Sequence, residues 1–319
     1  MKSWKALSLE ETSFRKNATG LFMTRILLSL CLLMLLAPAG AEIYRYKNEQ
    51  GRWVFSDEKP NGDGYKEVRV RGKEKGKTQP SVTQRRDGAD YVLSATNPWH
   101  LPVELLVKDP GLPGGSGRAL VPADTTTDIH RGTQRMDSPE VAWVMGAPSA
   151  EHDTDAIYRF PVASWKSFEI SQGFNGEFSH QKRANRHAID VEMQVGTWLA
   201  AARGGVVARI KEDYHLSGTS RFFADKANFV AVLHDDGTYA VYAHILPDTT
   251  VVEPGERVER GDRLARSGSS GFSTGPHLHF VIRRNTGLRP ESVPFRIENR
   301  DGREVVPERG MHFMGQGEQ

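Results

Sequence analysis

One segment of this 319-residue chain reads Ser273-Thr274-Gly275-Pro276-His277-Leu278-His279-Phe280-Val281-Ile282, and its second half alternates in the manner of a β-strand. After Pro276, one side of the strand carries Leu278, Phe280 and Ile282, and the other side carries His277, His279 and Val281. The apolar side anchors the strand while two imidazoles project together from the opposite side. Imidazole is the commonest protein ligand for zinc and the commonest proton shuttle near neutral pH, so this strand is a candidate metal or catalytic site. A His-x-His pair alone is weak evidence for such a site, because most such pairs are ordinary surface residues.

The rest of the chain also predicts β-structure. Residues 204–210 form a strand after a tight turn, and residues 228–234 and 238–244 form two strands joined at Asp235-Asp236-Gly237, a strong hairpin signal. Residues 88–160 alternate short β-prone runs with Pro/Gly turns, which indicates a small β-sandwich. Residues 42–65 resemble a short β module, and 66–87 a charged linker. The expected fold class is mostly β, with a compact antiparallel domain over 161–299 and a tail over 300–319.

A second candidate residue, Asp190, stands in the run His187-Ala188-Ile189-Asp190-Val191. If the run is a strand, Ile189 and Val191 face the core and Asp190 faces the other way. His187 is three residues from Asp190, so a regular strand directs these two side chains to opposite faces. His180 is separated from Asp190 by a polar stretch, 181–186, that can loop back. We therefore favour His180 over His187 as the partner of Asp190 and keep His187 as the alternative.

The N-terminus predicts an export signal. Residues 26–36 form a nearly unbroken apolar run that follows Arg25 and is too short to span a bilayer comfortably. Ala39-Gly40-Ala41 supplies small residues for cleavage before Glu42, so residues 1–41 are the expected signal peptide, with Met23 a possible true start. An uncleaved N-terminal anchor is the alternative. After cleavage we expect no stable membrane insertion and a periplasmic or secreted location.

The composition of the mature chain limits both its partners and its metal ligands. Residues 1–41 carry five basic and two acidic side chains, so their removal lowers the net charge from +2 to −1. Such a balance gives no electrostatic footprint for nucleic acid. The single cysteine, Cys31, leaves with the signal, and the residues before it lack the small side chain of a lipoprotein signal. Any metal must therefore be held by nitrogen and oxygen ligands.

Several motifs in order resemble the lysostaphin-type zinc metallopeptidases. They span about residues 165–297 and are Ser171-Gln172-Gly173-Phe174, Ser179-His180, Ala188-Ile189-Asp190, Gly196-Thr197, Ala201-Ala202-Arg203-Gly204-Gly205-Val206-Val207, Tyr242-Ala243-His244 and Gly275-Pro276-His277-Leu278-His279-Phe280. Members of this family adopt a compact antiparallel β-fold and cut peptide bonds in peptidoglycan. Many members place the first histidine four residues before the aspartate, where this chain has Arg186; His180 matches the members with a longer insertion. The N-terminal unit similarly resembles a small module of unknown function in exported bacterial proteins.

The resemblance implies one Zn²⁺ per chain, held by His180, Asp190 and His279, with His244 and His277 as the catalytic histidines. Taken alone, His244 is simply a capped strand end. Two histidines and one carboxylate leave the fourth tetrahedral position open, as in catalytic zinc sites, where the metal activates water and polarises the scissile carbonyl. The chain lacks a His-Glu-x-x-His motif, so His277 is the expected general base, and His244 can donate a hydrogen bond to the developing oxyanion.

The expected function is zinc-dependent endopeptidase activity on peptidoglycan stem peptides. The alternative is a non-catalytic peptidoglycan-binding module, or an activator of other cell-wall hydrolases, on the same fold. Degenerate relatives of that kind have usually lost metal ligands, whereas this sequence keeps the full set. A regulatory protein partner is left open by the sequence.

Overall fold

The computed structural model describes residues 43–47, 53–56, 59, 64–68 and 79–315. The expected signal peptide (1–41) and the possible start at Met23 lie outside these residues. The described residues form 25 strands and two short 3₁₀ helices, η1 (Pro113–Gly115) and η2 (Arg221–Phe223), so the prediction of a mostly β chain is confirmed. In the part of the chain that the structure covers, no helix is long and apolar enough to cross a membrane.

The N-terminal residues form a small antiparallel sheet. Its strands are β1 (Ile43–Lys47), β2 (Trp53–Ser56) and β3 (Tyr65–Val68), with β1 in the centre. Both partners pair with β1 in antiparallel register. This sheet extends three residues beyond position 65.

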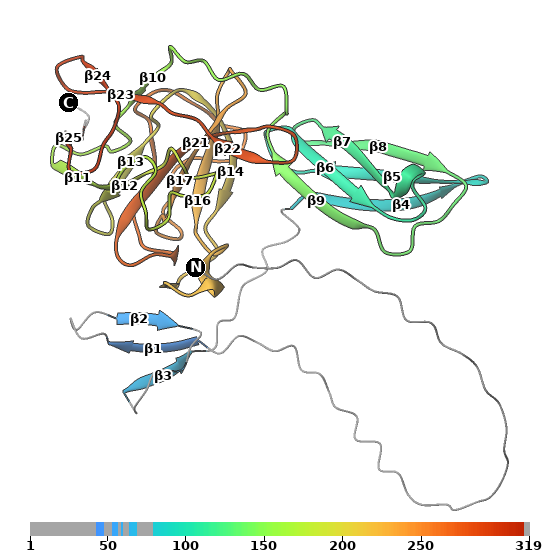
Figure 1. Ribbon diagram of the computed structural model, residues 1–319, viewed down its shortest axis with the longest axis horizontal. Helices are drawn as coiled ribbons and strands as arrows, with labels where there is room; N and C mark the ends of the chain where they lie inside the picture. Colours follow the sequence, from blue (N-terminus) through green and yellow to red (C-terminus); the bar gives the residue numbers. More distant parts are fainter. Residues whose placement is uncertain (1–42, 48–52, 57–58, 60–63, 69–78, 316–319) are drawn as a thin grey trace, which may run out of the picture. The chain divides into compact units, whose positions relative to one another are not determined.

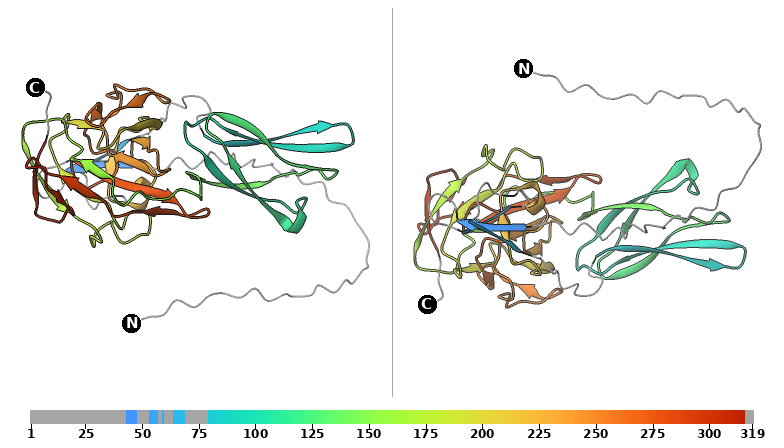
Figure 2. Two further views of the ribbon diagram at one scale, coloured as in Figure 1. Left: turned by 90° about the horizontal axis from the view of Figure 1, so that it is seen from above. Right: turned by 90° about the horizontal axis from the view of Figure 1, so that it is seen from below.

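Residues 81–145 form two three-stranded antiparallel sheets, seen as two layers in Figure 2. One sheet has the order β4-β5-β8 and contains β4 (Ser81–Asp87), β5 (Asp90–Asn97) and β8 (Thr125–Gly132). The other has the order β7-β6-β9 and contains β6 (Val103–Lys108), β7 (Ser116–Val121) and β9 (Glu140–Met145). Alternate positions such as Leu93, Leu105 and Val107 are buried between the layers. The charged composition of residues 66–87 predicts a linker, but its second half forms strand β4. This strand is held by antiparallel pairing with β5, which the composition does not reveal.

The C-terminal residues build a nine-stranded antiparallel sheet (Figure 1). Eight strands follow the order β18-β14-β16-β17-β21-β12-β11-β25, and β22 pairs with β21 off this path. Their bounds are β11 (Ser167–Gln172), β12 (Ile189–Glu192), β14 (Gly205–Lys211), β16 (Phe229–Leu233), β17 (Tyr239–Ala243), β18 (Arg257–Val258), β21 (His277–Asn285), β22 (Pro290–Ser292) and β25 (His312–Met314).

Three smaller sheets surround the large one. They pair β13 (Trp198–Ala200) with β19 (Arg263–Arg266), β15 (Ser217–Gly218) with β20 (Gly271–Phe272), and β10 (Ile157–Arg159) with β23 (Arg296–Glu298) and β24 (Glu304–Val305). Strands β24 and β25 lie in the stretch 300–319 that reads as a tail. Phe313 of β25 is buried and stacks on Phe160 at 5.0 Å between ring centroids, so β25 contributes to the core.

The alternation in β21 divides the large sheet into two faces. Leu278, Phe280 and Ile282 are fully buried in the main core, together with residues such as Ile189 and Tyr242 from the neighbouring strands. The opposite face of β21 carries His277, His279, Val281 and Arg283. The hairpin turn before β17 is closed by Asp236, whose Oδ1 accepts hydrogen bonds from the backbone and hydroxyl of Thr238.

One end of this second face is covered by the sandwich. Trp99 and Leu101 share a buried apolar cluster with Val241 and Val281. The backbone N–H of His100 donates to the carbonyl of Ala208 at 3.0 Å. The remaining end of the face, which carries His277 and His279, opens into a groove.

Candidate active site

The candidate metal ligands come from two adjacent strands and one loop. Asp190 of β12 lies directly opposite His279 of β21, so both side chains project from the same face of the sheet. His180 comes from the loop between β11 and β12 and is fully buried. One donor atom from each of the three residues lies within 4.8 Å of the others, and among the described residues they are the one such group. The structure therefore brings together the three residues expected to hold zinc.

The hydrogen bonds of His180 test whether a cation fits between these side chains. Its Nδ1 lies 2.8 Å from the carbonyl oxygen of Gly173, which can only accept, so Nδ1 carries the proton. In the neutral ring Nε2 then presents a lone pair, and it lies 3.2 Å from Oδ1 of Asp190. A lone pair and a carboxylate oxygen repel each other at that distance unless a cation or a proton lies between them. Two imidazole nitrogens and one carboxylate oxygen are a donor set that zinc accepts.

Asp190 is held from two sides. Its Oδ1 lies 2.8 Å from Nδ1 of His279, and its Oδ2 accepts a hydrogen bond from Nε2 of Gln172 at 2.7 Å. Burial raises the pKa of Asp190, but the contacts with His180 and His279 outweigh it and hold that pKa well below its usual range. Burial also lowers the pKa of His279, against the opposing effect of Asp190. The carboxylate is therefore ionised and oriented, as a metal ligand must be.

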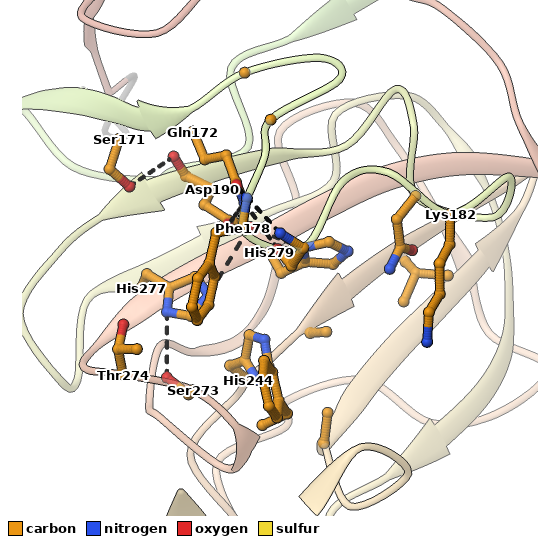
Figure 3. Close-up of a pocket in the computed structure, with 18 of the residues that line it drawn as sticks. Ser171, Gln172, Phe178, Lys182, Asp190, His244, Ser273, Thr274, His277 and His279 are labelled. Carbon is orange, nitrogen blue, oxygen red and sulfur yellow. Dashed lines mark hydrogen bonds and ion pairs between the residues drawn. The ribbon is translucent and has the colours of Figure 1, made fainter. Parts of the chain in front are cut away.

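The two expected catalytic histidines face the same space (Figure 3). The ring centroids of His244 and His277 are 4.5 Å apart, and those of His244 and His279 are 6.0 Å apart. Nδ1 of His277 donates to the carbonyl of Gly275 at 2.9 Å, and Nε2 lies 3.8 Å from Asp190 Oδ1. Nδ1 of His244 donates to the carbonyl of Ser270 at 2.6 Å. In their neutral forms both rings thus present an acceptor Nε2 to the site.

The position of His244 requires an unusual backbone. Its φ is 64°, in the left-handed region, where β17 has just ended. Burial lowers its pKa to about 3, with further contributions from His277 and His279. The loop beneath it depends on Gly271, whose φ is 80° and whose Cβ, if present, would overlap the backbone of Ala227.

A groove with a volume of about 2060 Å³ runs past these side chains. Phe178 and Phe272 stack across it at 5.9 Å between ring centroids, one from the loop after β11 and the other from β20. Its lining also includes Lys182, Arg209 and Phe229. An extended peptide fits a groove whose floor is the open face of a sheet.

Comparison with known proteins identifies this part of the chain. Residues 184–290 match the model described as peptidase family M23. This segment is a lysostaphin-type M23 peptidase domain. Residues 30–83 match a domain of unknown function, DUF4124, in agreement with the expected N-terminal module.

Curated relatives of the M23 domain include two named peptidoglycan or peptide endopeptidases. Over 130 residues, 40% of this chain and 27% of the relative, it is 29% identical to the peptidoglycan DD-endopeptidase ShyA of Vibrio cholerae. Over 126 residues, 39% of this chain and 32% of the relative, it is 31% identical to the glycyl-glycine endopeptidase ALE-1 of Staphylococcus capitis. The matched region thus spans less than a third of the length of these relatives. Among solved structures, the catalytic domain of lysostaphin from Staphylococcus simulans aligns with a TM-score of 0.25 and 23% identity, over 39% of this chain and 79% of that one.

His187, the alternative ligand, points away from the M23 site. Its Nδ1 lies 2.9 Å from the carbonyl of Ser292, and its ring packs edge-on against Phe174 at 5.3 Å between centroids. His187 lies in the turn before β12, which begins at Ile189, so its contacts with Ser292 and Phe174 set this direction rather than strand alternation.

The sequence alone indicates no role for Gln172, although this residue lies in the motif Ser171-Gln172-Gly173-Phe174. Its amide also accepts hydrogen bonds from the backbone N–H groups of Phe178 and Ser179, so it ties the His180 loop to Asp190. The carbonyls of Gly173 and Ser270 likewise set the histidine tautomers. Backbone carbonyls leave no sequence signal, and Gln172 becomes recognisable only through its pairing with Asp190 across β11 and β12.

Proposed function

We propose that this chain is an exported zinc-dependent endopeptidase, periplasmic or secreted, that hydrolyses peptide cross-links of peptidoglycan. The observation that carries the proposal is the convergence of His180, Asp190 and His279 beside two further imidazoles in an M23 domain. The similarity to a peptidoglycan DD-endopeptidase of Vibrio cholerae and to a glycyl-glycine endopeptidase of Staphylococcus capitis supports peptidoglycan peptides as the substrate class.

In this proposal His180, Asp190 and His279 hold one zinc ion. When bound, zinc polarises a carbonyl group and makes water a better nucleophile near neutral pH. The protein supplies the orientation of its ligands. Gly173 fixes the His180 ring through Nδ1, and Gln172 fixes the outer oxygen of Asp190.

His277 is the proposed general base. Its Nδ1 proton is used in the hydrogen bond to Gly275, so Nε2 is the atom that accepts the proton of the attacking water. Ser273 Oγ, 3.3 Å from Nδ1, helps to hold the ring in this orientation. A later transfer of the same proton to the leaving amine regenerates the neutral imidazole.

His244 is the proposed donor to the developing oxyanion. Its neutral ring presents an acceptor Nε2, because Nδ1 already donates to Ser270. It can therefore donate from Nε2 only after that atom gains a proton. The negative charge that develops on the substrate oxygen favours this protonated form, against the burial that lowers the pKa of His244 to about 3. The proton comes from solvent water in the groove and returns to it, because the proton held by His277 goes to the leaving amine.

Replacement of His279 by alanine tests the proposal. We expect purified wild-type protein to hold about one zinc per chain and to release soluble fragments from isolated peptidoglycan. The His279→Ala protein should lose the metal and at least about a hundredfold in hydrolysis, because loss of a ligand exceeds the 10–100-fold effect of residues that only support one. Metal content is measured by atomic emission, and the products by mass spectrometry, which also identifies the bond cut.

The matched control is His187→Gln, which removes a neighbouring imidazole that points away from the site. This variant should keep both zinc and activity. An unimpaired His279→Ala protein would overturn the proposal. A wild-type protein that binds peptidoglycan without releasing fragments would instead support the alternative, a binding module or an activator of other hydrolases.

A further inference from the structure

Arg209 has an unusual environment within the groove. Its guanidinium carbon lies 3.9 Å from the ring centroid of Trp99, 5.1 Å from that of Phe229 and 5.9 Å from that of Trp143. Trp99 and Trp143 belong to the sandwich and pack edge-to-face at 4.7 Å between centroids. The M23 domain and the sandwich therefore build this aromatic site together, and it holds the flat face of the cation.

No protein acceptor in the described part of the chain contacts the edge of the same guanidinium. Within residues 79–315 and the shorter described segments, no hydrogen bond or ion pair to Arg209 is formed. The five N–H groups of a guanidinium lie in its plane, so stacking on Trp99 cannot satisfy them. Burial lowers the pKa of Arg209 to about 10, which still leaves the group charged near neutral pH. Asp213 raises that pKa from a distance, but no carboxylate of the described residues contacts the half-buried cation, and an anionic ligand would supply one.

Strand pairing places Arg209 at a defined distance from the metal site. Arg209 lies opposite Ala231, Ala231 opposite Val241, and Val241 opposite Val281. This row is two residues along the strands from the row that contains His279. With strands about 4.8 Å apart and about 3.3 Å per residue, the Cα atoms of Arg209 and His279 are separated by about 16 Å. An extended peptide covers that distance with about five residues.

The other groove cations differ from Arg209. Arg283 donates through Nε to the carbonyl of Ala184 and through its terminal nitrogen to Asn185, so it already has acceptors. Lys182, Arg221 and Arg309 line the groove but are exposed to solvent. Only at Arg209 do aromatic rings orient a cation whose N–H edge points at no acceptor in the described residues.

We propose that Arg209 is a carboxylate-binding subsite, which selects bound peptides that carry an acidic side chain or a free carboxyl terminus up to about five residues from the cleaved bond. The proposal rests on the endopeptidase function and extends it to specificity. It also gives the sandwich a role, because Trp99 and Trp143 orient the cation. A planar guanidinium can bind a carboxylate through two parallel N–H···O bonds.

The test compares native peptidoglycan with peptidoglycan whose free carboxyl groups have been converted to amides. Zinc-loaded full-length wild-type protein should digest the native substrate at least about tenfold faster, as expected for charge-assisted hydrogen bonds. Arg209→Gln should digest both substrates at the slow rate that the wild type shows with the amide form. Arg209→Lys, which keeps a charge on the aromatic site, should show a reduced but measurable preference.

Arg221→Gln is the matched control and should retain the wild-type preference. Synthetic peptides then distinguish the two sources of the carboxylate: one series moves a single Glu or Gln along a neutral sequence, and a second ends in either a carboxylate or a carboxamide. A wild-type protein without preference, or an Arg209→Gln protein that retains it, would overturn the proposal.

Binding separates this proposal from the proposed function. If the wild-type protein cuts neither substrate, the endopeptidase function fails. Calorimetric titration of metal-free protein with the acidic and amidated peptides then shows whether Arg209 binds a carboxylate. At least about tenfold tighter binding of an acidic peptide by the wild type, lost in Arg209→Gln, supports the subsite; equal affinities overturn it.

Discussion

Two carboxylates in this protein are each buried near two imidazoles, yet they are satisfied in different ways. Asp190 lies between His180 and His279, and Asp236 lies near His152 and close in sequence to His234. Asp236 has a permanent cation, because its Oδ2 accepts from Nη1 of Arg203 at 2.8 Å. Asp190 has no Lys or Arg partner among the described residues, and its counter-charge must come from protons or from a metal.

The pKa values of both carboxyl groups lie below the usual range, so a depressed pKa does not by itself reveal a functional site. Burial raises the pKa of Asp236, but the hydrogen bonds to His152, Thr238 and Arg203 together lower it by a larger amount. The useful distinction is the identity of the partners. A carboxylate that pairs with arginine and a hairpin hydroxyl is structural, whereas one that faces two imidazoles and a groove can hold a metal.

The sharpest test of this distinction replaces each carboxylate by its amide. Asp190→Asn should lose zinc and more than about a hundredfold in peptidoglycan hydrolysis. Asp236→Asn should keep both but lower the free energy of unfolding by about 2 kcal/mol, because Arg203 loses a charged hydrogen-bond partner. Metal analysis, hydrolysis assays and urea unfolding measure the three quantities. Loss of zinc in Asp236→Asn would show that the two carboxylates are not independent.

Much of the candidate metal site can be predicted from the sequence, because its residues obey local rules. Alternation in 277–282 places His277 and His279 on one face, and the spacing of Asp190 from His187 favours His180 as the partner of Asp190. Arg209 and the strands β24 and β25 could not be recognised in that way. Arg209 stacks on Trp99, which lies 110 positions earlier in the chain, and β25 pairs with β11 only in the folded sheet. Contacts between residues so far apart in the sequence leave no local periodic pattern from which they could be predicted.

The histidine beside Asp236, His234, should make the stability of the protein depend on pH. Burial lowers the pKa of His234 to about 4; its Nδ1 donates to Gly204, while its Nε2 is without a partner. Arg203 lowers that pKa further, and Asp235 and Asp236 raise it. The unfolded chain protonates this histidine below about pH 6.5, whereas the folded protein holds it neutral. The free energy of unfolding should therefore fall as the pH drops from about 6.5 to about 4, by about 3 kcal/mol from this residue.

Unfolding of metal-free protein in urea at several pH values measures this slope. His234→Gln should flatten it, and His312→Gln, which removes an exposed imidazole, serves as the control. An unchanged slope in His234→Gln would mean that the acid sensitivity arises elsewhere, for example at His244 or His279.

The smallest effects concern the neutral groups that support each carboxylate. Gln172→Ala removes the hydrogen bond to Asp190 Oδ2 and the link to the His180 loop, so zinc affinity should fall about 10–100-fold. Thr238→Val removes the hydroxyl that donates to Asp236 at 2.6 Å, so the free energy of unfolding should fall by about 1 kcal/mol while zinc affinity stays the same. Competition with a chelating dye gives the affinities. If Gln172→Ala lowered only stability, Gln172 would resemble Thr238, and the metal site would owe its geometry to its three ligands alone. If its zinc affinity falls as expected, the orientation of Asp190 is a property of β11 as well as of the ligands themselves.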